Sequence, residues 1–184
     1  MEFINKRPKI FIISGKAGSG KDEVADIIKK IYKEMKCKKL SYAYYLKQYV
    51  KDITGWDGNN ETKPRDLLQS IGIDLLKEKI DSQLLIRRLC EDIEVYSYFY
   101  DVLIVTDARL IEEVEVPKSK FFNITTIRID RNIDNKLSSK QKEHITEVGL
   151  DNYNNFDYKI ENYENYDKLV SNVEKIIKEV NSYE

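Results

Sequence analysis

The feature that most constrains the fold is a glycine-rich loop between a predicted strand and a predicted helix. Residues 10–14 form a short apolar, β-branched run, which is typical of a strand buried on both faces. Helical periodicity begins directly after the glycines, and one apolar face contains Val24, Ile27, Ile28 and Ile31. The loop has the spacing G-x-x-x-x-G-K and consists of Gly15, Lys16, Ala17, Gly18, Ser19, Gly20 and Lys21.

This loop predicts a binding site for the phosphates of a nucleoside triphosphate. Glycines allow the backbone to curl so that successive N–H groups point inward at an anion, and the following helix adds its positive N-terminal dipole. We expect Lys21 to place its ammonium between the β- and γ-phosphates. The alternative is a glycine-rich turn without a ligand, but strand, loop, lysine and helix all agree with the phosphate site.

The rest of the chain alternates strands and helices, which indicates a parallel sheet covered by helices. We expect further strands at about 39–43, 102–106, 122–129 and 158–160. Helices are expected at about 44–53, 65–79, 81–94 and 169–180, and residues 132–142 are interpreted as a mobile loop. The pattern predicts a single α/β domain over residues 1–184, with three α/β/α layers and a parallel five-stranded sheet.

Composition narrows the possible partners and location. The formal net charge of −1 argues against a chain built to hold a nucleic acid backbone. Cys37 and Cys90 are far apart without metal-like spacing, so we expect reduced thiols. We see no apolar h-region of a secretion signal and no apolar run near the ~20 residues of a membrane span. We therefore expect a cytoplasmic protein with no membrane partner; the sequence leaves its oligomeric state open.

Residue 22 departs from the usual form of the loop, in which Ser or Thr supplies a hydroxyl to Mg²⁺. Asp22 can hold Mg²⁺ directly or through a water molecule. Alternatively, it caps the first turn of the helix. A carboxylate beside phosphate is repulsive without a cation, which favours a role with Mg²⁺.

Asp107 and Arg109 follow the predicted strand at 102–106. The carboxyl edge of such a sheet is where ligands are held. Asp107 is suited to ordering Mg²⁺ through water or to accepting hydrogen bonds from the acceptor. Arg109 could hold a transferring or acceptor phosphate. The alternative is an Asp-Arg pair that only shapes a turn.

Arg65 and Gln69 lie one helical turn apart on the same face of a predicted helix that opens after Pro64. A guanidinium there could clamp a monophosphate with two hydrogen bonds. Gln69 could contact an acceptor base or ribose. The alternatives are a surface ion pair of Arg65 with Asp66 or Glu61 and a solvated glutamine.

A segment of about residues 131–147 is predicted to act as a lid. Arg131 would stabilise the charge that develops during phosphoryl transfer, whereas Arg128 could be an outward strand residue. His144, the only histidine, is expected to orient the lid or to be exposed rather than to act as a general base. Tyr42 and Tyr44 are the tyrosines near the expected acceptor pocket, where a ring could stack on a base; the alternative is a place at the edge of the core or on the surface.

Several motifs together resemble the bacteriophage-type deoxynucleoside monophosphate kinases. The loop sequence Gly-Lys-x-x-Ser-Gly-Lys-Asp resembles their phosphate loop and is also similar to that of animal phosphomevalonate kinases. Further pieces follow in family order: Ser41-Tyr42-Ala43 with Leu46-Lys47; Arg65, Leu68, Gln69 and Gly72; Asp107-Ala108-Arg109 with Glu112 or Glu113; Arg131 and His144-Ile145-Thr146-Glu147; and Phe156-Asp157-Tyr158 with Ile160 and Asn162. Two departures are Lys77, where an arginine is expected, and a missing tryptophan in the next helix.

The resemblance implies a P-loop NTPase fold of the nucleoside monophosphate kinase type, with an acceptor-binding helical region at about 43–95. It implies ATP-dependent transfer to a (deoxy)nucleoside monophosphate. Catalysis would fall to Lys21, Asp107, Arg109 and Arg131, Mg²⁺ binding to Asp22 and Asp107, and acceptor binding to Lys47, Arg65, Gln69 and Arg109. The alternatives are a kinase for phosphomevalonate or dephospho-coenzyme A, and a nucleotide-binding module without catalysis, which Asp22 and Lys77 motivate.

Overall fold

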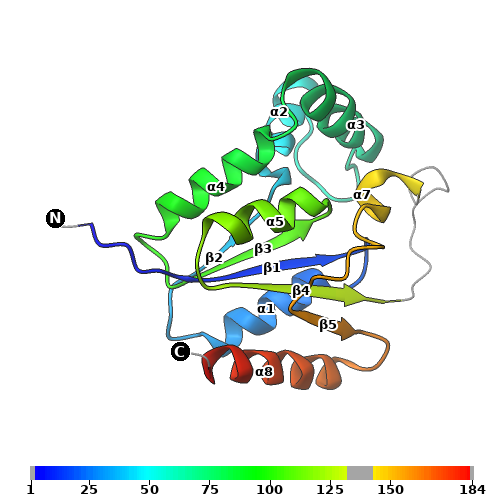
Figure 1. Ribbon diagram of the computed structural model, residues 1–184. Coiled ribbons are helices and arrows are strands. Elements are labelled where there is room, and N and C mark those ends of the chain that lie inside the picture. Colours follow the sequence, from blue (N-terminus) through cyan, green and yellow to red (C-terminus); the bar gives the residue numbers. More distant parts are fainter. Residues whose placement is uncertain (1–2, 132–142, 183–184) are drawn as a thin grey trace.

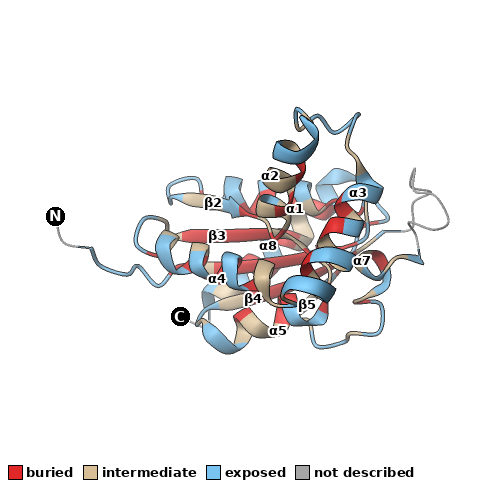
Figure 2. Cartoon of the chain, turned by 90° about the horizontal axis from the view of Figure 1, so that it is seen from above, coloured by how far each residue is buried: buried red, intermediate tan, exposed pale blue. Residues whose placement is uncertain are grey.

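The computed structural model describes residues 3–131 and 143–182 and shows the predicted parallel sheet (Figure 1). Its five strands are β1 (Lys9–Gly15), β2 (Cys37–Leu40), β3 (Val102–Ala108), β4 (Ile124–Asp130) and β5 (Tyr158–Glu161). They lie in the order β2-β3-β1-β4-β5, and every pair is parallel. The central strands are buried on both faces, as the red strands in Figure 2 show, which explains why they read as continuous apolar runs.

One face of the sheet is covered by α1 (Lys21–Ile31) and α8 (Tyr166–Ser182). Both helices are amphipathic and bury most of the stripes predicted from their periodicity, but Ile31 is 36% exposed and Val170 and Val180 are only partly buried. The core on this side includes Phe11, Ile28, Ile127 and Ile177, all at most 2% exposed. The phosphate loop is therefore anchored by a strand and a helix that both belong to the main core.

The opposite face is covered by α4 (Leu84–Tyr96) and α5 (Ile111–Lys120) (Figure 1). Its core joins strand residues such as Ile12 and Leu103 to Leu89 and Ile93 of α4 and Val114 of α5. The sequence interpretation did not include α5. Pro117 lies inside this ten-residue helix and weakens its helical pattern.

A third, smaller core lies beyond the sheet edge, where α2 (Ala43–Thr54), α3 (Arg65–Ser70) and η1 (Ile71–Ile80) pack together. The helix expected at 65–79 is thus one helical segment with a change of type, because η1 is a π-helix. The wider turn alters the helical face on which each side chain lies, and such segments often occur at functional sites. The predicted helix at 81–94 begins later, at Leu84, and β2 ends at Leu40, before the expected 43.

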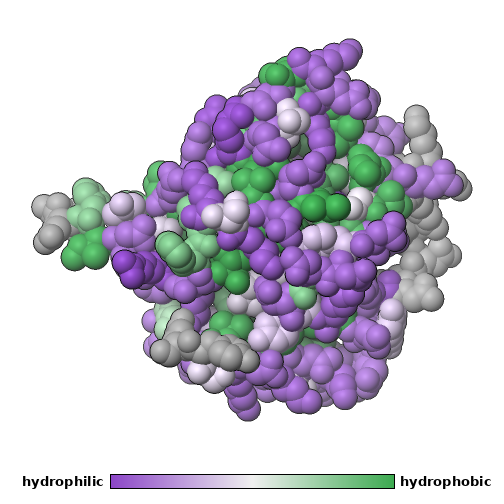
Figure 3. Space-filling model, viewed as in Figure 1, coloured by the Kyte–Doolittle hydropathy of each residue, from purple (hydrophilic) through white to green (hydrophobic). Residues whose placement is uncertain are grey.

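The surface is largely hydrophilic, with apolar side chains gathered over the region of α5 and α7 (Ile145–Val148) (Figure 3). Ile111 and Ile145, the first residues of these helices, are each 45% exposed. No helix in the described ranges is long and apolar enough to span a membrane. Cys37 and Cys90 are free thiols, in agreement with the expectation.

Candidate active site

The phosphate loop lies at the carboxyl end of β1, between the ends of β3 and β4. The connections that leave the neighbouring strands β1 and β3 run in opposite directions, through α1 on one face and α5 on the other, and open α/β sheets bind ligands at such a point. Gly20 caps α1 with a left-handed φ of 100°, and a Cβ there would lie 2.6 Å from Asn162 Nδ2. A Cβ on Gly15 would lie 2.6 Å from the Ile129 carbonyl oxygen. The loop therefore requires glycine at both positions.

Lys21 extends back across this loop. Its ammonium donates hydrogen bonds to the carbonyl oxygens of Gly15 at 2.8 Å and Lys16 at 2.7 Å. Burial lowers the pKa of Lys21 to about 8, and the nearby charge of Arg109 adds to this effect. The carboxylates of Glu147, Asp22 and Asp107 act in the opposite direction. Lys21 is thus a desolvated cation at the centre of a charged cluster.

Ser19 and Asn162 complete the inner side of the loop. Asn162, after β5, donates from Nδ2 to the Ser19 carbonyl oxygen at 2.9 Å and is buried. The Ser19 hydroxyl is buried and has no hydrogen-bond partner among the described residues. Buried hydroxyls are normally paired, so an orphan in a phosphate loop fits a ligand or water oxygen.

Glu147 of α7 contacts the loop from the other side. Its Oε2 accepts a hydrogen bond from the Ala17 amide at 3.1 Å, and its Oε1 accepts one from Arg109 Nη1. Arg109 also donates to the Thr146 carbonyl oxygen at 2.9 Å. A carboxylate therefore joins a phosphate-loop amide to the arginine at the end of β3.

Asp107 has a clear structural role at the end of β3. It accepts hydrogen bonds from Ser41 Oγ at 2.6 Å and from the amides of Tyr42 and Ala43 at 2.9 and 3.0 Å. These groups form the start of α2, so a carboxylate caps the helix and complements its dipole. Asp107 also lines the cavity described below and acts on the pKa of Lys21. Asp107 therefore lies between α2, whose start it caps, and Lys21 of the phosphate loop.

The structure distinguishes between the two candidate acids after Arg109. Glu112 is paired with Lys77 at 3.7 Å, whereas Glu113 is buried and accepts from the amides of Arg109 at 2.7 Å and Leu110 at 3.1 Å. Burial raises the pKa of Glu113 to about 7, and the backbone hydrogen bonds oppose that rise. Glu113 fixes the turn that aims the Arg109 side chain.

A cavity of about 170 Å³ opens between α2, α3, η1 and the end of β3. Much of its wall is apolar and comes from Leu46, Leu68, Ile73, Leu76, Leu85 and Ile86. Its cationic residues are Lys47, Lys63, Arg65, Lys77 and Arg109. Lys47, Arg65, Gln69 and Arg109, predicted as acceptor-binding residues, therefore converge on one cavity that an apolar ring and an anionic group could fill together.

Lys63 is a cation that the sequence reasoning missed. Burial lowers its pKa, with further contributions from Lys47, Arg65 and Arg109 in that order. In the described part of the chain, Lys47, Lys63 and Arg65 form no ion pair with a carboxylate. The expected alternative pairing of Arg65 with Asp66 or Glu61 is absent there. The Lys-Pro-Arg sequence at the start of α3 was the available signal.

Arg128 is not the outward strand residue that the sequence left as a possibility. It is buried on β4 and donates to Ser14 Oγ and to Asp151, each at 3.2 Å, and to Asp130 at 3.0 Å. Asp151 also pairs with Lys16 of the phosphate loop at 2.7 Å. Arg128 thus connects the end of β1 to the segment after α7, and two carboxylates neutralise its charge.

Other predicted residues lie apart from this cluster or are only partly described. Arg131 is exposed at the end of β4, and residues 132–142 of the predicted lid lie outside the described residues. His144 caps α7 by accepting from the Thr146 amide at 3.3 Å. Gln69 donates weakly to Thr146 Oγ1 at 3.5 Å. These contacts place the described end of the predicted lid next to the cavity.

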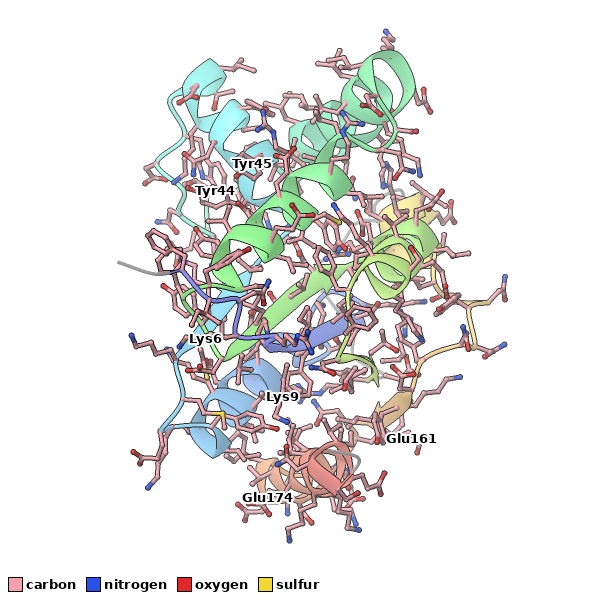
Figure 4. The ribbon with its side chains drawn as sticks, turned by 60° about the vertical axis from the view of Figure 1, so that its left-hand side comes forward. Lys6, Lys9, Tyr44, Tyr45, Glu161 and Glu174 are labelled. Atoms are coloured by element: carbon pink, nitrogen blue, oxygen red, sulfur yellow. The ribbon has the colours of Figure 1, made fainter. Side chains whose placement is uncertain are left out.

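The two tyrosines proposed for base stacking differ. Tyr42 lines the cavity, is 3% exposed and donates its hydroxyl hydrogen bond to the Glu113 carbonyl oxygen. Tyr44 is 53% exposed and packs edge-on against Tyr45, with ring centroids 5.1 Å apart. Figure 4 shows Tyr44 and Tyr45 together on α2, and Tyr45 bonds to Asp92 of α4. Only Tyr42 belongs to the cavity wall.

The charges of the site fit Mg²⁺ bound together with a polyphosphate rather than by protein alone. Within residues 3–131 and 143–182 no group of three or more His, Cys, Asp or Glu side chains could hold a metal. Mg²⁺ is usually held by one or two carboxylates, waters and substrate phosphates. Asp22 and Asp107 both raise the pKa of Lys21, so two carboxylates lie near the predicted phosphate position.

Comparison with known proteins places this geometry in a family. A family profile described as deoxynucleotide monophosphate kinase matches residues 40–173. This range is well over half of the chain and excludes the phosphate loop, so the loop is independent support. No curated protein matches significantly.

Solved structures share the fold at low sequence identity. The APS kinase of Mycobacterium tuberculosis, solved with AMPPNP and APS, is 15% identical with a TM-score of 0.57, over 94% of this chain and 98% of that one. The dephospho-CoA kinase of Campylobacter jejuni is 14% identical with a TM-score of 0.57, over 94% and 97%. The shikimate kinase of Aquifex aeolicus is 15% identical with a TM-score of 0.53, over 92% and 96%. The α/β fold is thus that of P-loop kinases, and the chain belongs to the deoxynucleotide monophosphate kinase family and is a phosphotransferase.

Proposed function

We propose that this protein transfers the γ-phosphoryl group of ATP to a (deoxy)nucleoside monophosphate and releases the two diphosphates. The observation that carries the proposal is the position of Arg109. It lines the cationic cavity and also lies close enough to Lys21 to lower the pKa of that lysine. A donor at the phosphate loop and an acceptor in the cavity would therefore meet at one arginine, as phosphoryl transfer requires.

The phosphate loop is the proposed donor site. Amides from Ala17 to Lys21 would surround the phosphates, and the unpaired Ser19 hydroxyl supplies one further hydrogen bond. The Lys21 ammonium would lie beside the transferring group, where its low solvation makes its charge more effective. Phosphate binding would also raise the pKa of Lys21, since an anion favours the charged form.

The cavity is the proposed acceptor site. Lys47, Lys63 and Arg65 lack carboxylate partners in the described structure, so an anionic group would relieve their mutual repulsion. A guanidinium fork and two ammonium groups suit the monophosphate of the acceptor. The apolar wall would hold its base, and Gln69 lies within the wall as a polar contact.

Mg²⁺ would be bound with ATP, with Asp22 and Asp107 in or near its coordination shell. When bound, the ion would neutralise charge on the phosphate oxygens and orient them. Arg131 would add positive charge from the lid segment at about 131–147, and closure there would exclude water and limit hydrolysis of ATP.

An acceptor panel tests the proposed reaction. Purified protein with Mg²⁺ and ATP is assayed for ADP release with dGMP, dTMP, dAMP and dCMP, and with phosphomevalonate and dephospho-CoA. We expect transfer to at least one nucleotide and not to the other two compounds. Transfer only to phosphomevalonate or dephospho-CoA, or tight ATP binding without transfer to any acceptor, would disprove the proposal.

Lys63→Met tests the acceptor site separately. Loss of one charge-assisted contact should raise the KM for the monophosphate about tenfold and leave the KM for ATP unchanged. Lys51→Met on the nearby helix α2 is the matched control, because Lys51 lies outside the cavity wall. Equal effects of the two substitutions on the KM for the monophosphate would show that Lys63 does not bind the acceptor.

A further inference from the structure

Glu147 occupies a position that a phosphate oxygen would need. Its Oε2 accepts the Ala17 amide at 3.1 Å, and its Oε1 accepts Arg109 Nη1. The Glu147 side chain is only 7% exposed, so these contacts replace much of its hydration. The carboxylate thus acts as an internal anion between the phosphate loop and the acceptor cavity.

A bound triphosphate and this carboxylate would compete. Phosphate loops hold anions through inward-pointing amides, and the Ala17 amide is one of them. Two anions within hydrogen-bond distance of the same donor repel strongly when water is largely excluded. The carboxylate must therefore leave Ala17 when the donor binds.

Displacement of Glu147 would also change Arg109. In the structure this guanidinium is paired with Glu147 and held against the Thr146 carbonyl oxygen at 2.9 Å. Arg109 lines the same cavity as Lys63 and Arg65. Once released, its uncompensated charge would increase the attraction of the cavity for an acceptor phosphate.

We propose that Glu147 is a positioning residue that holds the phosphate loop without nucleotide and, when displaced by triphosphate, frees Arg109 for the acceptor. The identity of both ligands rests on the proposed function above. The mechanism makes donor and acceptor bind with positive coupling, and by linkage each raises the affinity for the other by the same factor. Glu147 acts through Arg109 and the loop and does not touch the reacting atoms.

Isothermal titration with AMPPNP and Mg²⁺, with and without dGMP, tests this coupling in three proteins. Wild type should bind dGMP at least about fivefold more tightly when AMPPNP is present. Glu147→Gln should bind AMPPNP alone about tenfold more tightly, since a neutral amide competes less well for the Ala17 amide, and should lose most of the coupling. Glu174→Gln removes an exposed carboxylate on α8, outside the cavity wall and the phosphate loop, and should behave as wild type.

Steady-state kinetics supply a second readout, because a purely structural defect would lower kcat and affinity together. We expect Glu147→Gln to lower the KM for ATP and Glu147→Asp, which keeps the charge, to retain part of the coupling. Unchanged AMPPNP affinity in Glu147→Gln, or absence of coupling in wild type, overturns the inference. The wild-type measurement can overturn the inference even if Glu147→Gln fails to fold, and Glu147→Asp then supplies the variant comparison.

Failure of the proposed function would look different. If wild type and Glu147→Gln bind AMPPNP with the predicted difference and no monophosphate is phosphorylated, the function is wrong and the competition at the loop stands. If wild type phosphorylates dGMP while Glu147→Gln leaves both affinities and their coupling unchanged, the function stands and the inference fails.

Discussion

Replacing Lys21 by methionine should make the folded protein more stable while it greatly lowers the rate of phosphoryl transfer. Burial lowers the pKa of Lys21 from 10.5 to about 8. This shift is equivalent to about 3 kcal/mol by which folding disfavours the ammonium, at about 1.4 kcal/mol per pKa unit. Methionine fills similar space without a charge, so Lys21→Met removes that penalty at neutral pH.

Part of the gain is offset by lost hydrogen bonds. Lys21 donates to the carbonyl oxygens of Gly15 and Lys16, although the latter also accepts the Ser19 amide at 3.1 Å. Allowing about 1 kcal/mol for these contacts leaves an expected net gain of about 2 kcal/mol in the free energy of unfolding. The rate of transfer should fall by about 10²–10³, because a preorganised charge at the transferring phosphate is removed.

The sign of the pH dependence makes this prediction specific. The pKa of Lys21 is lower in the folded state, so the unfolded chain binds more protons between about pH 8 and 10.5. The penalty is therefore complete below about pH 8 and declines as the pH rises. The advantage of Lys21→Met should shrink by about 2 kcal/mol between about pH 7 and pH 9.5.

Urea unfolding of both proteins at the two pH values measures this difference and cancels the titration of other groups. Lys29→Met, at an exposed position on the same helix, is the control and should change stability by less than about 0.5 kcal/mol. A Lys21→Met variant that is less stable than wild type at neutral pH would refute the reasoning. A stability difference that does not vary with pH would do so equally.

Three further predictions concern residues that hold the site in place. Asp107→Ala should lower the free energy of unfolding by about 2 kcal/mol in urea titrations, because it removes the cap of α2, with Ser41→Ala costing less. Glu113→Gln should remove a loss of stability that wild type shows as the pH rises from about 4.5 to 7, since the folded pKa of Glu113 is raised to about 7; equal unfolding curves would contradict it. Asn162→Ala should raise the KM for ATP more than that for the monophosphate, because the Ser19 carbonyl oxygen loses its donor, and an equal rise in both would argue against a local effect.

Much of the fold could be predicted because the relevant signals are local. The buried strands and the amphipathic helices α1 and α8 are periodic over short windows, and the phosphate loop is specified by glycines whose positions the backbone requires. The π-helical geometry of η1 and the late start of α4 could not be read this way. Both lie at the small core where Leu68 and Leu76 meet Val50 of α2 and where Leu84 packs, and such tertiary contacts are not visible in a short window of sequence.

The site was predicted less completely for a different physical reason. Arg65, Gln69 and Arg109 were identified one by one because each follows a helix start or a strand end. The proposed roles of Lys63 and Glu147 follow only from their neighbours in the fold. Lys63 lies near other unpaired cations, and Glu147 accepts hydrogen bonds from an amide and a guanidinium. The Lys-Pro-Arg sequence and the family-like segment 144–147 contain these residues, but neither pattern says which groups their side chains meet.

The contacts of Arg109 explain how the two binding sites could be coupled, which a sequence motif alone does not show. Its backbone amide is fixed by the buried Glu113, while its side chain is held by Glu147 and lines the cavity. Glu147 lies 38 residues away from Arg109 in the sequence. The pairing of β1 with β3 and the contacts of α7 with both ends bring the phosphate loop, Arg109 and the cavity together. A rigid backbone with an exchangeable side-chain partner is the combination that lets one ligand alter the charge presented to another without rearranging the core.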